Sequence, residues 1–447
     1  MRLKRIEINS LFGIYNHEID FADGNITLLL GDNGVGKSTI FKLVDALFNE
    51  EFSTLLSIDF GRLFIELEDG SFEVVRFIDE NGNIDLRICF VDNEGFKSSE
   101  TLSAIEETRS EAIRQIKRYF PKHYRQIDDD KYRDMISREE FTRAQVVGKF
   151  QSIIPDSVKE ALVFPKWLKV AISEIDMVYV GAQRILTQVG KDEDGEGVLQ
   201  YKNTLRIFSE DLVQRIAESV NAASKVATDL DSTFPKRLMK CFQEKDLKVE
   251  SQVRLSQKLK RIEKIQNELS RVGLVSYDPN STLTIKNYYG YDRIVISTVL
   301  KSYIDDMTVK LAAYQDIYKK LSLFIYLANA YLLDKTLSID PAKGILINSV
   351  IGDKRTINID RLSSGEQNVL VLFYDLIFKT DPGSILLLDE PEISLHVVWQ
   401  RRLVDDLLQV TTINPIQICI ATHSPSLINT HWDITQEIES KENGQGE

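Results

Sequence analysis

The feature that most constrains the fold of this chain is a short glycine-rich segment near its N-terminus. An apolar run, residues 25–30, leads into the sequence GDNGVGKS, and the following TIFKLVDALF has the spacing of an amphipathic helix. Gly31, four further residues, Gly36, Lys37 and Ser38 form a pattern in which backbone N–H groups face phosphate oxygens at a helix N-terminus. The sequence therefore predicts a strand, a phosphate-binding loop and a helix, as in an α/β nucleotide-binding domain.

Each residue type in this loop suits a phosphate ligand. Glycines let the backbone approach phosphate oxygens, the Lys37 ammonium would neutralise β- and γ-phosphate charge, and the Ser38 hydroxyl would hold Mg²⁺. A chance glycine turn is the alternative interpretation, but it explains neither the strand before the loop nor the helix after it. The residues expected to bind the nucleotide are Asn33, Gly34, Gly36, Lys37, Ser38 and Thr39.

Two later apolar runs end in polar residues that fit the same site. ILLLDEPE, residues 385–392, is typical of a buried parallel strand that delivers carboxylates at its C-terminal edge. Asp389 would hold Mg²⁺ through water, and Glu390 would polarise the attacking water as general base. IQICIATHSPSLI, residues 416–428, predicts another such strand. We expect His423 at the same sheet edge, where it can contact the γ-phosphate and sense its loss.

The segment RLSSGEQ, residues 361–367, is a polar turn that opens an apolar helix. Its serine and glycine would lie at a helix N-terminus, which predicts a second anion-binding site. One nucleotide per chain does not need two phosphate sites in the same place. We therefore expect this segment to close on the nucleotide that another copy of the chain holds.

Between these motifs the sequence changes character several times. Hairpin-like separators predict a small antiparallel β unit at 60–95, and 100–170 is mostly helical in pattern. Residues 203–335 are strongly helical and fit either a projecting helical hairpin or an ordinary helical subdomain. The coiled-coil positions are Leu255, Leu259, Ile262 and Leu269 in one helix, and Leu300, Tyr303, Met307, Tyr314, Ile317 and Leu321 in a second.

These changes predict four regions. They are an N-terminal lobe at 1–190, a helical or coiled-coil insertion at 200–335, a C-terminal lobe at 336–434 and a disordered tail at 435–447. The polar loop at 190–198 is the expected boundary of the first lobe.

Composition excludes several classes of protein. The net charge of −13 argues against a surface coated in basic residues for nucleic acid. Cys89, Cys241 and Cys419 are isolated and odd in number, so the sequence predicts neither a disulfide framework nor a zinc knuckle. We expect a cytoplasmic protein without a signal peptide, and without a membrane helix because the longest apolar run, residues 321–333, is too short.

Taken together, GDNGVGKST, LSSGEQ, LLLDEPE, ISLH and ATHSP resemble the head domain of ABC-class ATPases, in the branch that includes Rad50, SMC, RecF and OLD proteins. The resemblance covers roughly 1–190 and 336–430. It implies an α/β P-loop head, with a mixed sheet flanked by helices and a small antiparallel β unit, that carries an inserted helical or coiled-coil arm. It also implies Mg²⁺-dependent hydrolysis of ATP to ADP and phosphate.

The resemblance assigns further residues. Ser363 and Gly365 would contact the γ-phosphate in trans, within a homodimer or higher oligomer whose nucleotide sites are shared between copies. Gln183 matches the Q-loop, where it would bind the metal and take part in catalysis. Ser394 and His396 occupy the D-loop position.

Departures from the family pattern narrow the resemblance. Ser364 and Glu366 replace the Gly and Gln of transporters, no CxxC hook is present, and the chain ends soon after His423, which leaves no room for a TOPRIM nuclease. Val397 stands where an OLD-type LHP motif has Pro. The chain most resembles the ATPase subunits of two-gene bacterial anti-phage systems, PARIS and then Septu. That resemblance implies an ATPase that stores a separate TOPRIM-type nuclease and releases it when a phage protein is sensed.

A DNA-repair ATPase of the RecF or Rad50 kind is the alternative. It would act directly on DNA and would need a strip of Lys and Arg on the helical arm. Such a strip could be built from Lys258, Lys260, Arg261 and Lys264, although Glu263 and Glu268 interleave with them. A structural protein with an inactive site fits poorly, because every phosphate, metal and base position is filled.

Overall fold

The structure is a computed structural model that describes residues 2–21, 24–78, 84–103, 124–128, 131–134, 140–142, 166–181, 186–189, 200–243, 250–278, 290–352 and 355–438. The chain forms two compact units. The first unit comprises residues 1–184, 190–200 and 379–447, and the second comprises 185–189 and 201–378. The C-terminal lobe predicted at 336–434 is thus divided after Phe378, because its first half packs with the inserted helices.

The core of the first unit is a parallel sheet of five strands in the order β11-β17-β18-β3-β19. Its three central strands are almost wholly buried, as expected for a sheet covered on both faces. The register places the ends of β3, β17 and β18 side by side at one edge. The strands are β3 (Ile26–Leu30), β11 (Met177–Val180), β17 (Ile385–Asp389), β18 (Gln417–Thr422) and β19 (Thr435–Glu437).

The last of these strands lies in the segment predicted to be a disordered tail. Thr435–Glu437 pair in parallel with β3, and the N–H of the buried Ile438 donates to Leu30 O at 2.7 Å. The prediction is wrong for these residues, because pairing with a strand four hundred residues away leaves no local signal in composition. Residues 439–447 lie outside the described part of the chain.

A second sheet of the first unit is antiparallel, with the order β2-β1-β4-β5-β6-β7. It is larger than the small β unit predicted at 60–95, because the N-terminal strands join it. The α/β class is confirmed, and so is an antiparallel β unit separate from the main sheet. The main sheet was predicted to be mixed, whereas its five described strands are all parallel. The strands are β1 (Leu3–Leu11), β2 (Tyr15–Asp20), β4 (Arg62–Leu67), β5 (Gly70–Ile78), β6 (Ile84–Asp92) and β7 (Lys97–Ser103).

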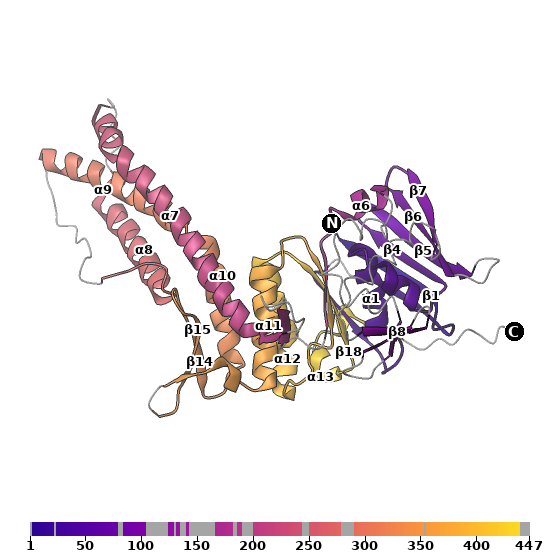
Figure 1. Cartoon of the computed structure of the whole chain (residues 1–447). Helices are drawn as coiled ribbons and strands as arrows, with labels where there is room; N and C mark the ends of the chain where they lie inside the picture. The colour runs from indigo at the N-terminus through magenta and orange to yellow at the C-terminus, as the bar shows by residue number, and fades with distance from the viewer. Residues whose placement is uncertain are drawn as a thin grey trace. The chain divides into compact units, whose positions relative to one another are not determined.

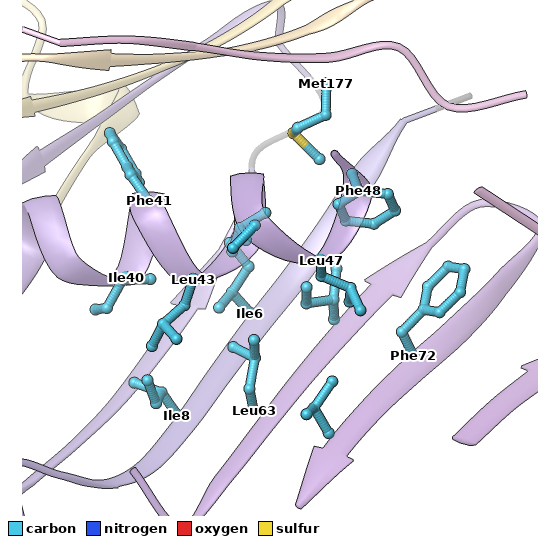
Figure 2. Close-up of a cluster of buried hydrophobic side chains, with 14 of the residues drawn as sticks. Ile6, Ile8, Ile40, Phe41, Leu43, Leu47, Phe48, Leu63, Phe72 and Met177 are labelled. Atoms are coloured by element: carbon cyan, nitrogen blue, oxygen red, sulfur yellow. The ribbon is translucent and has the colours of Figure 1, made fainter. Parts of the chain in front are cut away.

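Helix α1 (Lys37–Phe48) packs between these two sheets. Figure 2 shows Leu43 and Leu47 of this helix directed toward Ile8 and Leu63 of the antiparallel sheet. The same buried cluster includes Leu29, Ile385, Leu387 and Cys419 of the parallel sheet. A helix with apolar contacts on two sides cannot rotate without exposing one of them to water. The packing therefore fixes the start of α1 relative to the ends of β3 and β17.

Short elements complete the described part of the first unit. Residues 124–142 contain an antiparallel sheet, β10-β9-β8, within a segment predicted to be mostly helical. The pairing of β8, β9 and β10 decided the outcome here, because partners on neighbouring strands are not visible in the local residue pattern. These elements are α2 (Phe52–Ser57), β8 (Tyr124–Asp128), β9 (Lys131–Asp134), β10 (Glu140–Thr142), α6 (Lys166–Ile172), α12 (Val397–Ile413), α13 (Pro425–Ile428) and a 3-10 helix (Trp432–Ile434).

The second unit carries the predicted helical arm. In Figure 1, α7, α8 and α9 run alongside one another. The helices are α7 (Thr204–Gln243), α8 (Gln252–Arg271), α9 (Gly290–Ala312) and α10 (Gln315–Ala330). The heptad residues predicted in the first helix are buried in α8. The second predicted helix is divided between α9 and α10, where Ile317 and Leu321 are buried and Leu300, Tyr303, Met307 and Tyr314 are half-buried.

An ion pair ties two arm helices together. The Arg237 guanidinium of α7 contacts both oxygens of Asp306 of α9, with Nη2 donating to Oδ2 at 2.7 Å. Because Asp306 is buried, its charge needs a specific partner, and Arg237 provides it.

None of the described helices is both long and apolar enough to cross a membrane.

The base of the arm packs on α11 (Ser364–Tyr374), the helix that the RLSSGEQ segment opens. Phe208 of α7 stacks on Tyr374 of α11 with ring centroids 4.5 Å apart, and Phe324 of α10 meets the same ring edge-on.

The remaining elements are β12 (Leu186–Val189), β13 (Gln200–Asn203), β14 (Lys335–Asp340), β15 (Gly344–Ser349), β16 (Thr356–Ile357), a 3-10 helix (Ile359–Arg361), α11 (Ser364–Tyr374) and a π-helical turn (Asp375–Lys379).

Candidate functional site

The glycine loop has the backbone shape that its sequence predicts. Gly34 and Gly36 adopt the left-handed conformation, with φ of 89° and 96°. At Gly36 a Cβ atom would lie 2.4 Å from Leu11 Cδ2, so no larger residue fits without movement. Gly36 is also the N-cap of α1 and makes no side-chain capping bond. The first N–H groups of α1 are therefore available to an anion.

Lys37 is buried at the start of α1, with an exposed fraction of 4%. Its Nζ donates to Gly31 O at 2.7 Å and to Asp32 O at 3.0 Å, and it lies 3.0 Å from His423 Nδ1. Burial lowers the pKa of the ammonium, while the Glu390 carboxylate and its acidic neighbours oppose that shift. The Lys37 ammonium can exchange its hydrogen bonds to the carbonyls of Gly31 and Asp32 for hydrogen bonds to phosphate oxygens.

Ser38 and Asp389 meet at the edge of the parallel sheet. Ser38 Oγ donates to Asp389 Oδ1 at 2.8 Å, and the Tyr179 hydroxyl donates to Asp389 Oδ2 at 3.1 Å. A hydroxyl and one carboxylate form a donor set that suits Mg²⁺, which commonly takes its other ligands from water and phosphate. The described residues contain no group of three or more His, Cys, Asp or Glu that could hold a metal ion. The Ser38 hydroxyl and the Asp389 carboxylate are oxygen ligands that suit Mg²⁺ when water and a bound phosphate supply the others.

His423 and Glu390 follow the ends of adjacent strands and contact each other. The Nε2 atom of His423 lies 2.9 Å from Glu390 Oε1, and its Nδ1 lies 2.7 Å from Gly31 O. Glu390 has a positive φ of 45°, and its N–H donates to Ala421 O at 2.9 Å. This turn places the Glu390 side chain toward the loop, so the structure brings Lys37, Glu390 and His423 together as the sequence predicts.

Glu392 is a buried carboxylate that the sequence reasoning missed. Its Oε1 accepts from the Thr422 hydroxyl and from the His423 N–H, whose nitrogen is 3.3 Å away, while its Oε2 is buried and has no hydrogen-bond partner among the described residues. Burial raises the pKa of this carboxyl. Tyr179 was missed as well. Two features of the sequence could have pointed to them: Glu392 is the third acid of the DEPE motif, and Tyr179 is a tyrosine in an otherwise apolar strand.

The predicted D-loop residues shape the turn into α12. Ser394 has a positive φ of 67°, and His396 caps the helix, with its Nδ1 accepting from Val398 N at 3.3 Å. Val397 is the first residue of α12. Proline is favoured at the first residue of a helix because the N–H there has no partner within the helix, but other residues are tolerated. This explains how Val397 can replace the Pro of an LHP motif.

In the second unit, Ser363 is the N-cap of α11 and forms a capping box with Glu366. Glu366 Oε2 accepts from Ser363 N at 2.8 Å and from Ser363 Oγ at 2.9 Å, and its Oε1 accepts from Lys335 Nζ at 2.6 Å. Burial alone would raise the pKa of Glu366, but Lys335 and Ser363 outweigh it and lower the pKa. The glutamate that departs from the transporter pattern thus has a structural role. Gly365 is buried in the first turn of the same helix.

Some predictions fall outside the described residues. They concern Gln183, the loop at 190–198 and the segment at 279–289. The roles assigned to Gln183 in metal binding and catalysis therefore stay predictions.

A glycine loop between a buried strand and a helix, beside a parallel sheet edge that carries an aspartate and a glutamate, defines a P-loop nucleotide-binding fold. The model of the AAA ATPase domain family matches residues 1–428, and the chain belongs to this family.

Two solved structures of SMC head domains are similar to the chain. One is the Smc head domain with an extended coiled coil, bound to the C-terminal domain of ScpA, derived from Pyrococcus furiosus. It shares 13% identity, with coverage of 95% of this chain and 90% of that chain and a TM-score of 0.34. The other is the SMC head domain from Thermotoga maritima, with 12% identity, coverage of 96% and 91%, and a TM-score of 0.30. No curated protein matches the sequence.

Asp45 of α1 lies behind this site and predicts a pH effect on stability. Burial and the nearby Glu51 carboxylate raise the pKa of Asp45 to about 6, although Asn49 Nδ2 donates to its Oδ1 at 2.8 Å. The folded pKa exceeds the unfolded value of ~3.9, so the folded state binds more protons between these values and stability falls as pH rises from about 4 to about 6.

The variant Asp45→Asn should therefore be more stable than the parent at pH 7.5, by roughly 1–2 kcal/mol after allowance for partial exposure of the carboxylate. The gain should shrink toward zero near pH 4. Urea unfolding at both pH values measures this difference, and an equal difference at the two would contradict the assignment.

Proposed function

We propose that this chain is a Mg²⁺-dependent ATPase of the SMC and Rad50-like branch, which hydrolyses ATP to ADP and phosphate. One observation carries the proposal. The pair Ser38–Asp389 lies beside the Lys37–His423–Glu390 cluster, so metal-binding, phosphate-binding and basic groups share one sheet edge. Phosphoryl transfer needs these groups together, because its catalysis is mainly positioning and electrostatic stabilisation.

Each residue then has a defined task. Lys37 releases the carbonyls of Gly31 and Asp32 and binds phosphate oxygens, while Ser38 and Asp389 hold Mg²⁺, which offsets phosphate charge when bound. Glu390 accepts a proton from water as the water oxygen bonds to the γ-phosphorus and the bond to ADP breaks. His423 orients Glu390 through Nε2, at 2.9 Å from Oε1.

Two substitutions test these tasks separately. Lys37→Ala should weaken nucleotide binding at least tenfold, because it removes the buried ammonium. Glu390→Gln should keep binding but reduce turnover on the order of a hundredfold or more. Labelled-nucleotide titration and phosphate release measure the two effects, and Lys42→Ala, an exposed lysine on the same helix, is the control. Unchanged hydrolysis in both variants would sink the site assignment.

We also propose that Ser363 and Gly365 act on the nucleotide of another copy, in a homodimer or higher oligomer. Support comes from the N-terminus of α11, where the small residues Ser363, Ser364 and Gly365 and the positive end of the helix dipole suit an anion. Glu366 and Lys335 hold Ser363 in place at the start of the helix. The glycine loop belongs to the first unit and α11 to the second, and one nucleotide per chain does not need two anion sites in the same place.

Mixing two inactive variants tests the shared site. Ser363→Arg and Lys37→Ala should each be inactive, since each damages every site of its own homo-oligomer. A mixture can form sites in which both elements are intact, so some ATP hydrolysis should return. Phosphate release over a range of mixing ratios measures the recovery, with a mixture of Ser363→Arg and Glu390→Gln as a second pair. No recovery at any ratio would count against sharing.

We propose further that the ATPase controls a separate nuclease of the TOPRIM type in anti-phage defence and responds to a phage protein in the cytoplasm. The likeness of LSSGEQ, LLLDEPE and ATHSP to two-gene defence ATPases supports this role. The alternative, direct action on DNA in repair, needs a basic strip on α8. Lys258 of α8 pairs with Glu250, which precedes the helix, at 2.7 Å, and Lys264 approaches Glu268 at 3.7 Å, which weakens such a strip.

Expression with and without the neighbouring gene tests the defence role. Phage protection should require both genes, and Glu390→Gln should abolish it while the partner still co-purifies. Protection by this chain alone, or tight salt-dependent binding to duplex DNA without a partner, would favour the repair function instead.

A further inference from the structure

We propose that Tyr179 is a positioning residue for the metal carboxylate, fixing Asp389 through its hydroxyl group. This inference rests on the proposed nucleotide site and deepens it. Tyr179 belongs to no motif that the sequence reasoning identified, and its ring could be explained by packing alone. Its hydroxyl, however, donates to Asp389 Oδ2 at 3.1 Å, at the edge where Ser38 Oγ donates to Oδ1 at 2.8 Å.

The two hydroxyl groups reach Asp389 from different elements. Ser38 is at the start of α1, and Tyr179 is on β11, which pairs in parallel with β17 so that Tyr179 lies opposite Leu387. Asp389 is mostly buried, with an exposed fraction of 7%. With each oxygen bonded to a separate hydroxyl, the carboxylate cannot rotate about χ2 without breaking both bonds. The plane of the carboxylate is therefore set before a metal ion arrives.

The strand that carries Tyr179 packs against the helix that carries Ser38. Asp45 lies two turns along α1, and the backbone of Tyr179 is among the groups that act to lower its pKa. The side chain of Asn49 also reaches Met177 O on the same strand, at 3.5 Å. The ring of Tyr179 packs against the buried cluster around α1. Together these contacts fix where the hydroxyl points, which is what a positioning residue requires.

The geometry separates two effects of losing the hydroxyl. Nucleotide phosphates contact the glycine loop and Lys37, neither of which bonds to Tyr179 in the described contacts. Removal of the hydroxyl should leave metal-free nucleotide binding intact. It should, however, let the carboxylate turn away from Ser38, so Mg²⁺ binds less tightly. Outer-shell partners of metal ligands commonly change metal affinity by 10–100-fold.

The test is Tyr179→Phe, which keeps the ring and its packing. A fluorescent ATP analogue is titrated against the full-length chain without metal and then at increasing Mg²⁺. The variant should bind the analogue without metal within about twofold of the parent, and should need roughly tenfold more Mg²⁺ to reach half of the metal-dependent gain in affinity. Tyr374→Phe is the matched control, because it removes a hydroxyl bond of 2.7 Å to Asp211 in the second unit. Its Mg²⁺ requirement should equal that of the parent.

A double-mutant cycle with Asp389→Asn keeps the inference testable if Tyr179→Phe also perturbs packing. If Tyr179 acts through Asp389, its substitution should have little further effect on Mg²⁺ dependence in the Asp389→Asn background. Additive effects, an unchanged Mg²⁺ requirement in Tyr179→Phe, or loss of metal-free binding in that variant would each overturn the inference. Failure of the proposed nucleotide site is recognised separately, because then neither the parent nor Lys37→Ala would show the expected binding behaviour.

Discussion

The packing of α1 between two sheets is the constraint on which the candidate site depends. Ile40, Leu43 and Leu47 are fully buried, and the cluster that they join contains side chains of both the antiparallel and the parallel sheet. Rotation of the helix would expose several of these side chains, each at a cost of about 1.5–3 kcal/mol. The first residues of α1, Lys37 and Ser38, are therefore held against the strand ends that carry Asp389 and His423.

Burial of Lys37 creates an electrostatic problem that the neighbouring residues solve. An ammonium removed from water needs hydrogen bonds and opposite charge, and here Gly31 O, Asp32 O and the Glu390 and Asp389 carboxylates provide them. The acids in turn are held by hydroxyl groups and by His423. The charges of the cluster compensate one another and are already in place before a ligand arrives, as a pre-organised phosphate site requires.

The role of Glu366, which departs from the transporter motif, is explained only by its contacts in the folded chain. At 3% exposure its charge would be unfavourable alone, but Lys335 from β14 and the capping box at Ser363 stabilise it. The sequence shows that a glutamate replaces the usual residue. It does not show that a lysine thirty-one residues earlier reaches it.

What the sequence alone determined is local. Spacing and residue type predict the glycine loop, the apolar strands ending in Asp389 and Thr422, the helix that begins within RLSSGEQ and the heptads of α8, because the deciding interactions lie within a few residues. Tertiary structure decided what depends on distant partners. β19 joined the parallel sheet, β1 and β2 joined the antiparallel sheet, and β8, β9 and β10 formed a further sheet in a segment expected to be mostly helical. Pairing partners leave no trace in local composition. Tyr179 and Glu392 entered the site for the same reason: their roles arise from bonds to Asp389, Thr422 and His423, which only the folded chain brings within reach.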